Sequence, residues 1–159
     1  MPIVFNKRLL NYLIPLYSIL SGFLGVIAIL ATITNSMFNQ TIWFIMMDMI
    51  FLILYSLMLV FGISELMFGK KSILRFLVLL STFSISVIGL NYIFGGFYSL
   101  FLSVLVMEGI QFGIESNFGG RYSLYFNQIE ANKFIFALNV IPISLLAIDY
   151  KISGRKEKS

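Results

Sequence analysis

Two carboxylates lie inside apolar stretches of the sequence, and they are the first candidates for chemistry. Asp48 lies six residues after Ile42, the start of one apolar segment, and Glu108 interrupts the run SVLVMEGIQFGIES in another. An acid within lipid is expected to face protein or water, or to be protonated, and such acids often handle protons or cations. We therefore interpret both as candidate intramembrane acids. The structural alternative is that each bonds a neighbouring helix or reaches the membrane surface.

Small residues recur at helical spacing close to these acids. Gly109 and Gly113 are four residues apart, so on a helix they share a face that lets another backbone approach closely. The first apolar segment carries a similar stripe of small residues, namely Ser21, Gly25, Ala28 and Thr32. We predict that both faces pack against other helices. Hydroxyl groups that line a pore are the alternative interpretation of such faces.

The surroundings of Asp48 can be predicted from helical geometry. At 100° per residue, steps of seven residues return close to the same direction, so Asp48, Tyr55 and Gly62 are expected to form one stripe that faces the interior. Glu65 falls about 100° away on this count. We interpret Glu65 as a charge at the membrane boundary, paired with the lysines that follow it.

Two residues of the last apolar segment interrupt a helix. Pro142 lacks an amide N–H and frees the carbonyl of Leu138, and Asn139 adds a polar side chain. We predict a kinked helix at this position.

The chain contains neither cysteine nor histidine. This excludes disulfides, thiolate nucleophiles, the usual zinc sites, histidine-ligated haem and a histidine general base. Phosphate loops, dinucleotide fingerprints and nucleophile elbows are absent from the sequence as well. An intramembrane enzyme that acts on lipid would have to rely on the acids and Tyr55 alone. We therefore predict a protein that is not an enzyme and that binds no cofactor and no metal.

The composition predicts an integral membrane protein. Of 159 residues, 59% are hydrophobic and 11% charged, and the mean hydropathy is +0.95. Five apolar segments stand out, covering residues 9–33, 42–68, 72–94, 97–114 and 134–150. The first is too long for the core of a secretory signal and is interpreted as a membrane helix. Because a backbone in lipid must satisfy its own hydrogen bonds, and we find no alternation of period two, all five are predicted to be helices.

The predicted fold class is all-α: a polytopic integral membrane helical bundle with four to five transmembrane segments, forming one membrane domain over residues 1–159. Lysines and arginines favour the cytoplasmic side, which places the N-terminus there. Five spans put seven basic residues inside. Four spans, with residues 97–114 re-entrant or interfacial, put nine inside and two outside. Charge favours four spans, whereas the length of residues 97–114 favours five.

The remaining polar segments connect or end the bundle. Residues 115–133 are interpreted as an ordered loop, with a short interfacial amphipathic helix as the alternative. The basic tail, residues 151–159, is interpreted as an orientation signal that also suits anionic lipid headgroups.

Two functions remain after these exclusions. The first is a non-catalytic accessory or structural subunit that packs into a larger membrane complex or a homo-oligomer. The alternative is a transporter or channel component that moves protons or cations through Asp48 and Glu108. The expected partners are the lipid bilayer and other membrane subunits, or a second copy of the chain. Nucleic acid is not expected, because the net charge of +4 is distributed over segment ends.

Overall fold

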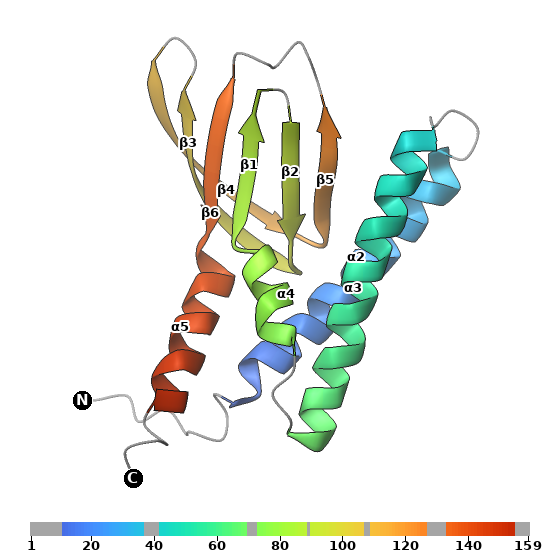
Figure 1. Cartoon of the computed structure of the whole chain (residues 1–159), viewed down its shortest axis with the longest axis vertical. Coiled ribbons are helices and arrows are strands. Elements are labelled where there is room, and N and C mark those ends of the chain that lie inside the picture. Colours follow the sequence, from blue (N-terminus) through green and yellow to red (C-terminus); the bar gives the residue numbers. More distant parts are fainter. Residues whose placement is uncertain are drawn as a thin grey trace.

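The computed structural model describes residues 11–36, 42–69, 73–88, 90–106, 109–126 and 133–154. These residues form four helices and six strands (Figure 1). The helices are α2 (Leu13–Ser36), α3 (Ile42–Phe68), α4 (Leu74–Leu80) and α5 (Val140–Gly154). The strands are β1 (Phe83–Val87), β2 (Leu90–Gly95), β3 (Tyr98–Val106), β4 (Ile110–Phe118), β5 (Arg121–Phe126) and β6 (Phe134–Asn139).

The prediction of an all-α bundle is therefore wrong. The segment 97–114 is not a helix but lies in β3 and β4, and the segment 72–94 changes from helix α4 to strands β1 and β2. The last segment begins as β6 and only then becomes α5, and the predicted loop contains β5. Two helices, rather than four or five, are long and apolar enough to cross a membrane, Leu13–Thr34 and Ile42–Phe68.

The error arose because the strands are almost as apolar as membrane helices. Their alternation is nevertheless present in the sequence: FSISV in β1 and IQFGIESNF in β4 change character at every step over most of their length. Serine and glycine lower the mean hydropathy of a strand much less than charged residues would. Aromatic and β-branched residues at the intervening positions favour strands. Ser84 and Ser86 of β1 thus lie on one face of a strand.

Helices α2 and α3 form an antiparallel hairpin. We call the end where α2 is followed by α3 the loop end, and the opposite end, where α2 begins and α3 ends, the terminal end (Figure 1). The helices approach closely at Gly22, where a Cβ atom would lie 2.6 Å from both the Leu59 nitrogen and the Tyr55 carbonyl oxygen. Glycine is therefore required for this distance between the two backbones.

The six strands form one antiparallel sheet with the order β4-β3-β6-β1-β2-β5. Strands β4 and β5 occupy opposite edges, yet only Gly119 and Gly120 connect them. The sheet must therefore curl until its edges meet at this end, and Figure 1 shows β4 passing behind the other strands to reach β5. Gly119, with a positive φ of 101°, donates its N–H to the Phe97 carbonyl at 2.7 Å and fixes the turn.

The register gives the sheet an apolar face and a small-residue face. One row across all six strands consists of Phe112, Val104, Phe136, Ile85, Tyr92 and Leu124. The adjacent row on the other face consists of Gly113, Ser103, Ala137, Ser84, Ile93 and Ser123. On the small-residue face Ser86 and Ser99 are buried, whereas Leu102 and Leu138 on the apolar face are exposed. This is the reverse of a sheet that presents its polar face to water.

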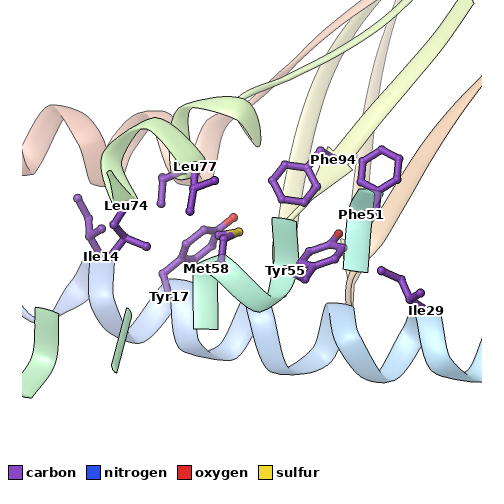
Figure 2. Close-up of a cluster of buried hydrophobic side chains, with 10 residues drawn as sticks. Ile14, Tyr17, Ile29, Phe51, Tyr55, Met58, Leu74, Leu77 and Phe94 are labelled. Carbon is purple, nitrogen blue, oxygen red and sulfur yellow. The ribbon is translucent and has the colours of Figure 1, made fainter. Parts of the chain in front are cut away.

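The hairpin meets the sheet through an aromatic cluster (Figure 2). The ring of Tyr55 lies 4.8 Å from that of Phe94, and Phe51 lies 5.1 Å from Tyr122, between ring centroids. The fully buried Tyr55 hydroxyl donates to the carbonyl of Gly95 at 2.7 Å and to that of Arg121 at 3.1 Å. One phenol from the middle of α3 therefore joins the ends of β2 and β5 to the hairpin.

The junction of β6 with α5 depends on Asn139 rather than on a helix kink. Asn139 is completely buried, and its Oδ1 accepts from the amides of Leu100 and Ile141 while its Nδ2 donates to the Ser81 carbonyl. Pro142 lies in the first turn of α5, where a missing N–H costs nothing. The predicted kinked helix is thus a strand followed by a helix.

Candidate functional site

A pocket of about 390 Å³ lies toward the loop end, between the hairpin and the start of β5. Its lining includes Ala28 and Thr32 of α2, three further residues of α3 beside Asp48, and residues 120–124. Thr32 and Phe44 are exposed and mark its opening. The volume is within the usual range for small-molecule sites.

Asp48 is the acid of this pocket. It is 6% exposed, and its Oδ2 atom is buried without a hydrogen-bond partner among the described residues. Helical spacing explains the burial, because Asp48, Tyr55 and Gly62 all lie on the buried side of α3 as predicted. A buried carboxylate oxygen without a donor is unfavourable, since it has lost its water and gained no bond.

Tyr122 brings a phenol to the same place. Burial raises the pKa of the Tyr122 phenol above its ordinary value, the Thr32 hydroxyl lowers it, and the Asp48 carboxylate raises it further. The phenol therefore stays protonated, close to both groups. Its oxygen is buried and has no hydrogen-bond partner among the described residues, although the Thr32 and Asp48 side chains lie close enough to shift its pKa. The pocket thus holds two polar atoms, from Asp48 and Tyr122, that a ligand would satisfy.

Arg121 supplies the basic group of the lining. Its Nη1 donates to Oε1 of Glu115 in an ion pair whose two side chains are 36% and 56% exposed. Because Glu115 already balances this charge, Asp48 is the acid of the pocket without an ion-pair partner among the described residues.

A second cavity of about 380 Å³ lies at the terminal end. Arg75 of α4 pairs there with the buried Glu65 of α3 and, at 3.2 Å, with Asp149 of α5. Glu65 therefore has an arginine partner, whereas the predicted lysines Lys70 and Lys71 lie outside the described residues. These ion pairs link α3, α4 and α5. The charged residues of this cavity therefore have a structural role, and we assign it no ligand.

The other predicted site residues are dispersed. Glu108 lies outside the described residues, so its predicted convergence with Asp48 is not part of this geometry. Gly109 and Gly113 do not form a helix face: Gly113 lies in β4 opposite Ser103, and Gly109 immediately precedes that strand. A Cβ on Gly109 would meet nothing within 4 Å. The glycine pair therefore cannot provide the close helix contact that its spacing predicted.

The small-residue stripe of α2 faces α3 and the sheet. Ser21 Oγ accepts the Phe97 amide at 3.0 Å, and Gly25 lies against the Tyr55 ring and the backbone of Gly120. Ala28 and Thr32 line the loop-end pocket.

Arg121 and Tyr122 were missed by sequence reasoning because the segment containing them was interpreted as a loop. The alternation in RYSLYF could have identified it as a strand. The position of this strand beside Asp48 depends on pairing between strands that are far apart in sequence. No local pattern in the sequence predicts such pairing.

Among the described residues, no group of three acidic, cysteine or histidine side chains is placed to hold a metal ion. What distinguishes the site is one buried acid, one buried phenol and an aromatic lining. Comparison of the chain with protein-family models, curated proteins and solved structures finds no match.

Proposed function

We propose that the chain is a non-catalytic membrane subunit that associates with a second copy of itself through the free edge of β4. The observation that carries the proposal is the exposure of this strand. Eight of its nine residues are exposed and Asn117 is half-buried. Phe112, Ile114 and Phe118 are 83%, 77% and 73% exposed.

Embedding in a membrane is supported by the apolar surface of the hairpin. Large apolar side chains are exposed along the whole of α3, from Trp43 at 69% through Ile53 and Val60, both 58%, to Met67 at 69%. At 1.5 Å per residue α3 is about 40 Å long, enough for a hydrocarbon layer of about 30 Å. A soluble monomer does not expose apolar surface so continuously.

Charge supports a cytoplasmic N-terminus. In sequence, nine of the eleven basic residues precede α2, lie between α3 and α4 or within α4, or fall at or after the end of α5. The other two, Arg121 and Lys133, belong to the sheet region. Lysine and arginine favour the cytoplasmic side of a membrane, so this distribution supports a cytoplasmic N-terminus.

An open strand edge is costly in such surroundings. Its outward N–H and C=O groups need partners, and lipid offers none. The other edge, β5, contacts α3, whereas β4 is hydrogen-bonded to a strand on one side only, namely β3. Pairing with a strand from another chain would satisfy these backbone groups.

The sequence of β4 suits antiparallel pairing with itself. A register centred on Ile114 pairs all nine residues, and it places Ile110 opposite Phe118 of the second copy. Glu115 then faces Gly113, so no two like charges are opposed directly. Such a pair has the two-fold symmetry that most homo-oligomers adopt.

Changing Ile114 to lysine tests the interface. A charged, long side chain at the centre of a free edge discourages strand pairing. We expect Ile114→Lys to weaken self-association in detergent or nanodiscs at least about tenfold, or about 1.4 kcal/mol. Concentration-dependent energy transfer between labelled copies measures the change.

The matched control is Ile88→Lys, which places the same charge at a residue that is 70% exposed but lies in the β1–β2 turn. It should leave association unchanged. Equal association of the Ile114 variant and the unchanged protein would contradict the proposal, and so would a monomeric unchanged protein.

Cation transport through Asp48 and Glu108 remains the second proposal from sequence. The unpartnered Asp48 in its pocket is the described feature that favours it. Unchanged cation and proton flux in proteoliposomes of Asp48→Asn would remove it.

A further inference from the structure

The loop-end pocket carries an inference that is independent of the association through β4. We propose that it binds a small organic ammonium group, carried either by a lipid headgroup or by a soluble amine. Asp48 is the counter-ion, and the aromatic side chains of the lining surround the cation.

Asp48 presents an unmatched hydrogen-bond acceptor to the pocket. Asp48 is more than nine-tenths buried, it lines the pocket, and its Oδ2 has no donor among the described residues. An ammonium group supplies the missing positive charge, and a primary ammonium supplies N–H donors as well.

The charge that the pocket leaves uncompensated is negative. Arg121 would attract an anion, but it is already paired with Glu115. The charge left for a ligand is therefore that of Asp48, which favours a cation.

The aromatic lining of the pocket favours an organic cation over a metal ion. Phe44, Phe51 and Tyr122 all line the pocket. Aromatic faces attract ammonium groups, and cages of such rings recognise quaternary ammonium ligands. Calcium, by contrast, takes about six to eight oxygen ligands, which is more than a single carboxylate provides.

The position of Asp48 along α3 makes a lipid headgroup one source of the ammonium group. Asp48 follows the first residue of α3 by about 9 Å along the helix axis, at 1.5 Å per residue. A helix about 40 Å long, centred in a hydrocarbon layer of about 30 Å, places this residue near the headgroup boundary. A lipid headgroup can then enter from the side. This source depends on the proposed membrane embedding, whereas binding of a soluble amine does not.

The experiment uses the full chain in two arms. In the first, tetramethylammonium and ethanolamine are titrated against the detergent-solubilised protein, and the shift of its thermal unfolding is measured, because a ligand that binds the folded state raises the Tm. In the second, native mass spectrometry measures how much phosphatidylethanolamine or phosphatidylglycerol the protein retains from mixed vesicles. Both lipids carry a phosphate, but only the first carries an ammonium group.

We expect Asp48→Asn to weaken amine binding at least tenfold or to remove the preference for phosphatidylethanolamine. Asp149→Asn makes the same chemical change at the terminal end and should preserve both. Phe44→Leu keeps an apolar side chain and should weaken tetramethylammonium binding several-fold. Because Phe44 is 50% exposed, this variant also guards against a failure of the Asp48 variant to fold.

The two arms separate the sources. A preference for phosphatidylethanolamine without a response to soluble amines assigns the lipid, and a response to soluble amines shows that a free amine suffices. Equal retention of the two lipids together with no amine response overturns the proposal. Equal binding by the unchanged protein, folded Asp48→Asn and Phe44→Leu also overturns it. None of these results depends on self-association through β4.

Discussion

Replacing Asn139 with leucine is expected to destabilise the fold by about 2–5 kcal/mol, because several buried groups lose their partners at once. The amide of Leu100 and the carbonyl of Ser81 bond the Asn139 side chain at 3.1 and 3.2 Å. Leucine has a similar size but neither donates nor accepts. The measurement is the unfolding midpoint in detergent, followed by circular dichroism.

The same change at Asn117 is the control. Asn117 lies half-buried in β4, and its loss should alter stability by less than about 0.5 kcal/mol. If both variants unfold at the same midpoint, Asn139 does not hold the junction of α4, β3 and α5 as described.

Changing Gly25 to leucine is expected to cost about 3 kcal/mol, the upper end of the usual penalty for overpacking. A side chain there would overlap the ring of Tyr55, and Gly120 packs against the same backbone. The ring cannot move aside cheaply, since Tyr55 is fully buried and its hydroxyl bonds two carbonyl groups. The better helix propensity of leucine, close to 1 kcal/mol, opposes this loss and makes the test conservative.

Gly109→Leu is the matched variant, because a Cβ on Gly109 has open space around it. Its unfolding midpoint should stay near that of the unchanged protein. The contrast also separates two interpretations of glycine in this chain. A large loss at position 109 with none at position 25 would restore the predicted packing face at Gly109 and Gly113 and contradict the observed one.

The sequence was sufficient to predict the hairpin but not the sheet. The predicted segment 42–68 coincides with α3, because a long charge-poor run with one buried stripe permits little except a helix. Asp48, Tyr55 and Gly62 follow from the same periodicity. The strands failed because their serines and glycines imitate the small-residue faces of membrane helices. Only the alternation of FSISV and IQFGIESNF distinguishes the two.

Of the candidate site, the sequence identified Asp48 but not the residues around it. Asp48 could be selected because a carboxylate in an apolar helix is costly wherever it points. Its neighbours Tyr122 and Arg121 could not, because their position follows from the curl of the sheet and from the two-glycine turn after β4. Long-range pairing of this kind has no local signature in one sequence.

A disulfide trap at position 114 tests the proposed self-association most directly. The chain has no cysteine, so a single introduced thiol has no partner within its own molecule, and a covalent dimer of twice the chain mass reports its reaction with a second copy. In the proposed register the two residues 114 face each other with Cβ atoms about 5 Å apart, whereas the two residues 110 lie about 27 Å apart, at about 3.4 Å per residue. Ile110 and Ile114 are similarly exposed, 68% and 77%, and lie on the same face of the strand.

Oxidation in native membranes, followed by non-reducing electrophoresis, should therefore convert Ile114→Cys to a covalent dimer and leave Ile110→Cys monomeric. Dimers that form equally at both positions, or at neither, would contradict the pairing of β4 with itself.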